Sequence, residues 1–206
     1  MVVIAAVADY IPGMSRYPHP RIGGDPALDF LNTVHDWTVQ PRVDRLTDYP
    51  AAVGFAEAAG LVSAAEARRL AGVPAGTEVA RLRELRAVLE RVFRAVAEGG
   101  TPGDADLDQL AREAAAAAGA ARLRGVRRGV ERRITVERDG ARTLRWRIVE
   151  AALALLTSPR LARVKACPQC GWFFRDASKN GSRRWCSMAM CGSVVKARRY
   201  YRRNRR

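Results

Sequence analysis

The four cysteines of this chain all lie in a short stretch near its C-terminal end. They form two pairs, Cys167-Pro-Gln-Cys170 and Cys186-Ser-Met-Ala-Met-Cys191, with fifteen residues between them. A Cys-x2-Cys pair makes a tight turn whose two thiolates converge on one ion, and Gly171 directly after it permits that turn. The second pair precedes a helical pattern and completes a tetrahedral donor set. We therefore expect one zinc ion held by Cys167, Cys170, Cys186 and Cys191.

Two other chemistries fit the same four cysteines. Two disulfides are disfavoured because the opening residues lack the basic n-region of a secretory signal. An iron–sulfur cluster has the same ligand count and stays open on spacing alone. With zinc, four thiolates leave no coordination position for an activated water, so we expect a structural metal rather than hydrolytic chemistry. A module of this size has a small apolar core, and metal binding should supply much of its folding free energy.

The segment between the two pairs predicts a β-hairpin. Trp172-Phe173-Phe174-Arg175 and Arg183-Arg184-Trp185 are interpreted as short strands, and the polar residues 176–182 as the loop that joins them. Such a hairpin between two cysteine pairs is typical of a zinc-ribbon or treble-clef-like module.

Almost all of the formal charge of +15 lies in the same part of the chain. Residues 158–206 contain fourteen Lys or Arg against the single acid Asp176, a net charge of +13, whereas residues 1–157 carry only +2. Such a local concentration of cations indicates a partner rich in phosphate. The candidate nucleic-acid-binding residues are Lys179, Arg183, Arg184, Lys196, Arg198, Arg199, Arg202 and Arg203.

The residues after Cys191 favour a cationic helix in which Lys196, Arg199 and Arg203 share one face. A basic helix beside a hairpin suits DNA or RNA. The alternatives are a disordered basic tail with non-specific affinity, an anchor for anionic lipid, and a zinc-stapled module for protein interaction. Trp172 and Trp185 are interpreted as packing residues of the module.

The remainder of the chain predicts a mainly α-helical domain. Helices are expected from Pro50, from a Ser63 cap to Leu70, from a Thr77 cap to Glu98, from Asp104 or Asp106 to Ala118, and from about Ile148 to Leu156. The segment from Ala27 to Val34 is apolar but does not distinguish strand from helix. Alternation in 133–138 and 142–147 around Asp139-Gly140 predicts a β-hairpin.

The expected fold class is therefore α+β, with three parts along the chain. Residues 1–20 are expected to be an unpatterned, disordered leader, residues 21–157 a mainly helical domain with a hairpin, and residues 158–206 the zinc module with its basic C-terminal helix. No apolar run reaches the roughly 18–20 residues that span a bilayer, so a cytoplasmic protein without a membrane segment is expected. Neither His19 nor His35 falls in a metal or catalytic pattern, and we expect no enzyme.

The chain resembles the bacterial family with an N-terminal ABATE domain and a C-terminal CGNR-type zinc finger. At the N-terminal side the resemblance rests on Gly23-Gly24, residues 27–33 (ALDFLNT), Asp44 and Leu46. At the C-terminal side it rests on Ser158-Pro159, Arg163-Val164, Cys167, Cys170-Gly171-Trp172, Phe174, Asp176, Ser178, residues 183–188 (RRWCSM), Cys191-Gly192 and Lys196-Ala197-Arg198. The resemblance implies a transcription regulator with four cysteine ligands on zinc and DNA as the partner.

One departure from that pattern concerns the name-giving Cys-Gly-Asn-Arg, which is Cys191-Gly192-Ser193-Val194 here. Ser193 is expected to cap the final helix, whereas Val194 cannot pair with Asp176 or a phosphate. Asp29 and Asn32 match the N-terminal motif of the family. We weigh two roles for them, as caps or tethers of a buried segment and as part of a small pocket in which the domain senses a ligand.

Overall fold

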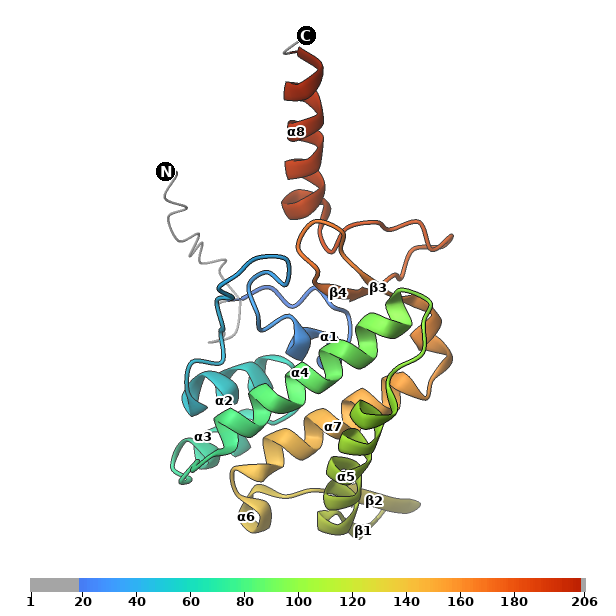
Figure 1. The fold of residues 1–206 in the computed structure, drawn as a ribbon. Coiled ribbons are helices and arrows are strands. Elements are labelled where there is room, and N and C mark those ends of the chain that lie inside the picture. Colours follow the sequence, from blue (N-terminus) through green and yellow to red (C-terminus); the bar gives the residue numbers. More distant parts are fainter. Residues whose placement is uncertain (1–18, 205–206) are drawn as a thin grey trace.

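The structure is a computed structural model of the chain, and it describes residues 19–204 (Figure 1). The expected leader of residues 1–20 lies outside this range except for its last two residues. Helices make up most of the first part of the chain: α1 (Pro26–Leu31), α2 (Tyr49–Ala58), α3 (Ala64–Ala71), α4 (Glu78–Ala97), α5 (Asp104–Ala120), α6 (Val136–Asp139) and α7 (Arg142–Leu156). The fold class is confirmed, a mainly helical N-terminal region with a small hairpin followed by a four-cysteine module.

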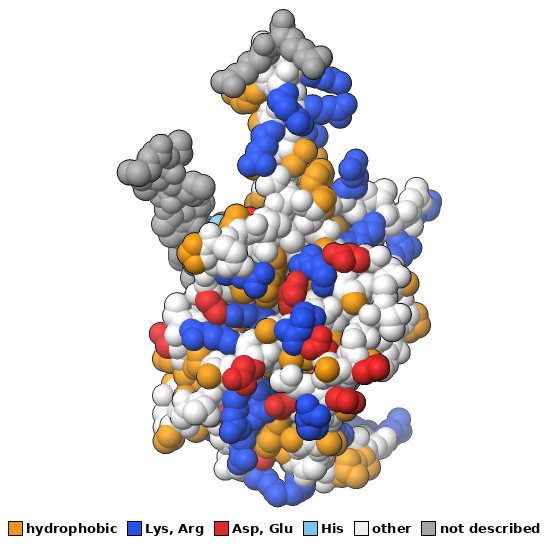
Figure 2. All heavy atoms as spheres, in the orientation of Figure 1, with side chains coloured by type: hydrophobic (Ala, Val, Ile, Leu, Met, Phe, Trp, Pro, Cys, Tyr) orange, Lys and Arg blue, Asp and Glu red, His pale blue; other side chains and the backbone are white. Residues whose placement is uncertain are grey.

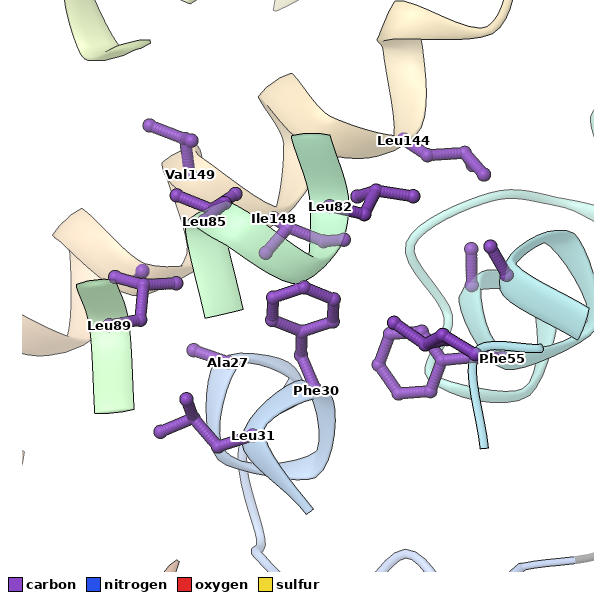
Figure 3. Close-up of a cluster of buried hydrophobic side chains, with 14 of the residues drawn as sticks. Ala27, Phe30, Leu31, Phe55, Leu82, Leu85, Leu89, Leu144, Ile148 and Val149 are labelled. Atoms are coloured by element: carbon purple, nitrogen blue, oxygen red, sulfur yellow. The ribbon is translucent and has the colours of Figure 1, made fainter. Parts of the chain in front are cut away.

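Helix α1 settles the segment that the sequence left undecided. Asp25 accepts a hydrogen bond from the amide of Ala27 at 3.1 Å, and Pro26 occupies the first helical position, where its missing N–H has no cost. The short helix buries Phe30, whose ring points towards Leu82 of α4 and Ile148 of α7 (Figure 3). Because α1, α4 and α7 all contact one another, this helix lies at the centre of the core.

Of the caps predicted for three helices, the structure confirms the one at Ser63. Ser63 and Glu66 form a reciprocal capping box at the start of α3. Helix α4 begins and ends within a residue of the predicted bounds, but Thr77 makes no side-chain cap bond. Helix α5 starts at Asp104 with Gly103 as its N-cap, so neither expected aspartate is the cap.

The predicted hairpin around Asp139-Gly140 is wrong in position. Residues 142–156 form helix α7, because Leu144, Ile148, Ala152 and Leu155 recur at spacings of three and four and are all fully buried or nearly so. The actual hairpin is formed by β1 (Arg122–Val126) and β2 (Gly129–Arg133), which pair antiparallel from Arg122↔Arg133 to Val126↔Gly129. Its side chains are almost all exposed, so it lacks the alternation of buried residues that would have marked it.

The C-terminal module packs on the helical domain. A 3-10 turn, η1 (Pro159–Arg163), leads from α7 into β3 (Val164–Ala166), which pairs antiparallel with β4 (Phe173–Arg175). Val164 and Phe173 belong to the same buried cluster as the core of the helical domain. The chain then passes through a π-helical turn, η2 (Met188–Gly192), into α8 (Ser193–Asn204), which projects away from the body (Figure 1).

The second strand predicted in the module, Arg183-Arg184-Trp185, is wrong. The partner of β4 is β3, which precedes the first cysteine pair, and residues 183–185 form a loop. The backbone amide of Arg183 donates to the Asp176 carboxylate at 2.9 Å, which holds this segment near β4 without a ladder. The first cysteine pair therefore lies in the turn of the hairpin and not before it.

Candidate metal centre and nucleic-acid interface

The four cysteine sulfurs converge at one point in the structure. All four Sγ atoms lie within 4.8 Å of one another, with 3.6 Å between Cys170 and Cys186 and 3.5 Å between Cys186 and Cys191. A tetrahedral zinc with Zn–S bonds of about 2.3 Å places its sulfurs about 3.8 Å apart. All four side chains are buried, and the donor set and its spacing fit a structural zinc ion.

The turn between the first two cysteines is held by backbone hydrogen bonds. The amide of Gly171 donates to the Cys167 carbonyl, and the amide of Cys167 to the Trp172 carbonyl, each at 2.8 Å. Gly171 has φ +72°, and a Cβ there would lie 2.7 Å from Cβ of Trp37. Both constraints require glycine, as the sequence pattern indicated.

The turn between Cys186 and Cys191 is capped by Ser187, whereas the sequence predicted a cap at Ser193. Ser187 is the N-cap of η2 and accepts a hydrogen bond from the Met190 amide at 3.2 Å. The expectation that Ser193 caps the final helix is wrong, since its hydroxyl donates to the Ala189 and Met190 carbonyls. The π-helical turn runs directly into α8, so Cys191 fixes the start of that helix to the metal site.

The four cysteine thiols shift one another's pKa values because their sulfur atoms are packed together. Hydrogen bonding from Cys170 lowers the pKa of Cys167, whereas hydrogen bonding to Cys167 raises the pKa values of Cys170 and Cys186. Burial is the main cause of the raised pKa of Cys191. Without a cation, only part of this cluster can ionise. The positive charge of a divalent metal would stabilise all four cysteines as thiolates, which are the form that binds the metal.

Asp176 organises the loop between the two cysteine pairs. Its buried carboxylate accepts hydrogen bonds from Nζ of Lys165 at 2.7 Å and from the hydroxyl and amide of Ser178 at 2.6 and 2.9 Å. The Lys165 ammonium is the largest cause that lowers the pKa of this carboxyl. Lys165 thus provides a cationic partner for Asp176 in a chain that has Val194 in place of the family arginine.

Arg183 faces into the module. Its guanidinium donates to the carbonyls of Trp185 and Cys186 and lies 4.5 Å from the ring centre of Phe174. Lys179 and Arg184 are exposed in the same loop. The structure therefore separates the three basic loop residues of the predicted interface into one inward and two outward side chains.

Asn32 joins the helical domain to the zinc module. Its amide donates to the Phe173 carbonyl at 2.8 Å and accepts from the Phe173 amide at 2.9 Å, and all these groups are buried. The indole of Trp172 donates to the Val34 carbonyl at 2.7 Å, and the Trp37 amide donates to the Cys170 carbonyl at 2.9 Å. These contacts are those of a tether between the two parts of the chain.

Asp29 has a local role. Its carboxylate accepts a hydrogen bond from the Gly23 amide at 2.8 Å, and burial raises its pKa to about 6. The amide of Arg175 in β4 donates to the Gly23 carbonyl, so Asp29 supports a loop that contacts the module. His35 contacts Arg45 through Nδ1 and lies outside the metal cluster.

Sequence reasoning did not identify the other contacts that hold this joint. The guanidinium of Arg94, near the end of α4, donates to the Gly171 carbonyl at 3.1 Å and lies 4.5 Å from the ring centre of Phe173. Arg94 is 77 residues from Gly171 along the chain. No spacing rule connects residues so far apart, and only a known relation between helix and module could have indicated the contact.

The basic residues of α8 are exposed, and none of the side chains of this helix is buried. Lys196, Arg198, Arg199, Arg202 and Arg203 project from the helix, which contains no acid. Figure 2 shows blue side chains without red ones along this part of the molecule, whereas blue and red alternate over the helical domain. The structure thus places the cations on a free-standing helix anchored at one end by Cys191.

A four-thiolate cluster on a β-hairpin turn and at a helix start defines a zinc-finger protein with a treble-clef-like module. Two family models match the chain. Residues 24–159 match ABATE, described as "Putative stress-induced transcription regulator", and residues 163–204 match the CGNR zinc finger. The first match covers more than half of the chain, so the protein belongs to the ABATE family and carries a CGNR zinc finger. A comparison with curated proteins gives no match.

The family and the geometry agree on zinc as the cofactor, and the four clustered cysteines are able to hold it. The predicted resemblance to the ABATE and CGNR families is confirmed. The two matched families are a regulator and a zinc finger, and neither is a family of enzymes. Within residues 19–204, none of the helices has the length and apolar character needed to cross a membrane.

Proposed function

We propose that this protein is a DNA-binding transcription regulator whose zinc module docks on duplex DNA through α8 and whose helical domain senses a small ligand. The single observation that carries the proposal is α8 itself, a helix with five cations, no acid and no buried side chain, fixed to the metal centre through Cys191. In the cell such a regulator would act in the cytoplasm, where bacterial DNA lies.

The dimensions of α8 suit the major groove. Its twelve residues span about 18 Å, and the groove is about 12 Å wide and admits one helix. A helix that packs on its own domain buries its apolar side chains. In α8, however, Val194, Tyr200 and Tyr201 are all more than 40% exposed. Among residues 19–204, the apolar side chains Val194, Tyr200 and Tyr201 are therefore left largely uncovered, and the charge of the helix favours phosphate.

Positions along α8 suggest different tasks. Lys196 and Arg199 lie in the first turns of α8, close in sequence to Cys191. We assign them contacts with base edges, because such contacts need defined geometry. Arg202 and Arg203 lie near the far end and are assigned to phosphates. Arg198, whose guanidinium lies 3.2 Å from the side-chain oxygen of Gln169, adjoins both groups.

The loop of the module adds a second, smaller basic surface. Lys179 and Arg184 are exposed there and are assigned to the DNA backbone. Arg183 takes part in the proposal as a positioning residue, because its guanidinium holds the carbonyls beside Cys186. Asp29 and Asn32 form the joint through which a signal from the helical domain would reach the finger.

Sequencing of nucleic acid crosslinked to the protein in cells tests the proposal. Enrichment at discrete genomic sites supports a DNA-binding regulator. Ribosomal or messenger RNA reads would replace it with an RNA-binding function, and an absence of enrichment over Cys186→Ser would indicate a protein-interaction module. The matched control is the double variant Arg198→Gln/Arg199→Gln, which keeps the metal site and removes charge from α8 alone.

A further inference from the structure

The helical domain has two adjacent hollows on its surface. One, of about 440 Å³, lies between the loop before α4 and the connection from α6 to α7. The other, of about 490 Å³, lies between α4, α5 and α7. Arg81 and Arg142 line both, so the two hollows adjoin, and we call them together the arginine hollow. Volumes of this order accommodate small molecules.

Four arginines contribute to the second part of the hollow, and one of them is already neutralised. Arg145 is buried and bonds the carboxylates of Glu78 and Glu113. Those two acids are thereby occupied, with Arg81 only 3.7 Å from Glu78 as a secondary contact. Among the described residues, neither Arg112 nor Arg142 forms an ion pair, although both line the hollow. The hollow therefore has an excess of positive charge.

Trp146 adds a hydrogen-bond donor without an acceptor. Its side chain lines the hollow and is only 7% exposed, yet no acceptor within residues 19–204 lies within reach of the buried Nε1–H. The guanidinium of Arg142 lies 5.3 Å from the centre of its ring. Buried donors in native proteins nearly always have partners, and an unpaired one costs free energy. Because the Nε1 atom is itself buried, this N–H is not accessible from the hollow, and the affinity of the hollow for a ligand rests on its arginines.

Two helices of the core, α4 and α7, begin beside the hollow. Neither Thr77, the N-cap of α4, nor Ala141, the N-cap of α7, makes a side-chain cap bond, and both residues line the first part of the arginine hollow. The first backbone N–H groups of a helix carry partial positive charge. Glu78 in the first turn of α4 offsets part of this charge, but it is engaged by Arg145.

We propose that the arginine hollow binds a small polyanion that carries at least two phosphate or carboxylate groups. A ligand with two charged groups fits best because the unpaired cations Arg112 and Arg142 come from different helices, α5 and α7, and Arg81 from a third, α4. Charge-assisted hydrogen bonds to arginine suit both kinds of group. This inference gives a site and a ligand class to the sensing role that the proposed function assigns to the helical domain.

The same helices connect the hollow to the zinc module. Helix α4 ends at the joint, where the Arg94 guanidinium donates to the Gly171 carbonyl. The ring centres of Phe93 and Phe173 lie 6.4 Å apart at the same place. Helix α7 continues through η1 into β3 (Figure 1). An anion that draws α4 and α7 together at their N-terminal ends would therefore change how their C-terminal ends support the turn that holds Cys167 and Cys170.

Isothermal titration calorimetry of the full zinc-loaded chain tests the site. The probes are inorganic pyrophosphate and citrate, titrated separately at constant ionic strength, so that the stronger one identifies phosphate or carboxylate as the preferred group. We expect one site per chain, and about a tenfold higher Kd in Arg112→Gln and in Arg142→Gln, as loss of one charge-assisted bond implies. Arg124→Gln, on the exposed hairpin, is the matched control with unchanged Kd.

Equal affinities in wild type, Arg112→Gln and Arg142→Gln would overturn the proposal, and so would binding that is lost only in Lys196→Gln/Arg199→Gln. The link to the finger is measured as the duplex affinity with and without saturating pyrophosphate, in wild type and in Arg142→Gln. Direct competition for α8 would persist in the variant, whereas an effect through the hollow would disappear. An unchanged duplex affinity would refute the link. If the chain binds no duplex at all, the proposed function fails while calorimetry still decides whether the site exists.

Discussion

The side-chain amide of Asn32 forms two reciprocal hydrogen bonds with the backbone of Phe173, at 2.8 and 2.9 Å, across 141 residues of sequence. The amide thus takes the place of a neighbouring strand beside β4. Phe173 follows directly after the turn that holds Cys167 and Cys170, so the metal site and the core of the helical domain depend on one another. This relation leads to the first two predictions.

Replacement of Asn32 should destabilise both parts of the chain. Asn32→Ala leaves the Phe173 amide and carbonyl buried without partners, and we expect a loss of about 2–4 kcal/mol in the free energy of unfolding. Urea unfolding of the zinc-loaded protein measures this loss, with Asn180→Ala in the exposed loop as the control. A loss below about 0.5 kcal/mol would show that the joint does not depend on this pair.

Removal of the metal should weaken the helical domain as well as the module. One zinc per chain is expected by metal analysis, and Cys186→Ser should reduce it, because three thiolates hold zinc less tightly than four. Val164 and Phe173 belong to the main core, so chelation should also lower the thermal midpoint followed by helical circular dichroism. A helical transition that is the same with and without zinc would contradict the shared core.

The buried guanidinium of Arg86 should be a sensitive point of the helical domain. It donates to the Thr33 hydroxyl at 2.6 Å and forms a bidentate pair with Asp44, and its side chain is only 6% exposed. Asp44→Asn should therefore cost about 2–4 kcal/mol, since it leaves the buried cation without its counter-charge. Asp106→Asn breaks the exposed pair with Arg91 and should cost less than about 1 kcal/mol in the same denaturant series. Equal effects of the two substitutions would count against this distinction.

Stability should fall as pH rises through the range of Asp29. Burial raises the pKa of this carboxyl from 3.8 to about 6 in the folded chain, so between pH 4 and 6 the folded state binds more protons than the unfolded state. Stability is then lost progressively over this window, by up to about 3 kcal/mol. Glu66, whose pKa is lowered to about 2 chiefly by Arg147, contributes stability that is lost only below about pH 4.5. Asp29→Asn should flatten the decline between pH 4 and 6 in thermal unfolding, and an unchanged slope would exclude Asp29 as its source.

Cations in α8 should differ in the way they affect duplex binding. Arg202→Ala and Arg203→Ala should weaken binding to a preferred and a scrambled duplex alike and reduce the salt slope by about one unit each. Lys196→Ala and Arg199→Ala should lower affinity for the preferred duplex by about 10–100-fold and less for the scrambled one. Fluorescence anisotropy over a salt series measures both quantities. If all four substitutions weaken both duplexes equally, α8 is a non-specific clamp.

The sequence alone determined the metal centre, the charge distribution and most of the helices. Cysteine pairs at fixed spacing, a capping box at Ser63 and the apolar period of residues 78–97 are local signals, and each acts within a few turns of chain. The basic helix was equally evident, because a charge excess needs no tertiary contact to be seen. In each of these cases the residues that specify the feature are close neighbours in sequence.

Tertiary structure decided the rest, for reasons of packing and distance. Residues 142–147 alternate like a strand but form a helix, because burial of Leu144 and Ile148 against α1 and α4 outweighs a six-residue pattern. Strand β4 pairs with β3 rather than with 183–185, since Asp176 and Arg183 tie that segment down by side-chain bonds. Asn32 and Arg94 bond to backbone groups of residues 141 and 77 positions away, and only the folded chain brings these groups together. The Trp146 N–H is buried without an acceptor, which also depends on the packing around it.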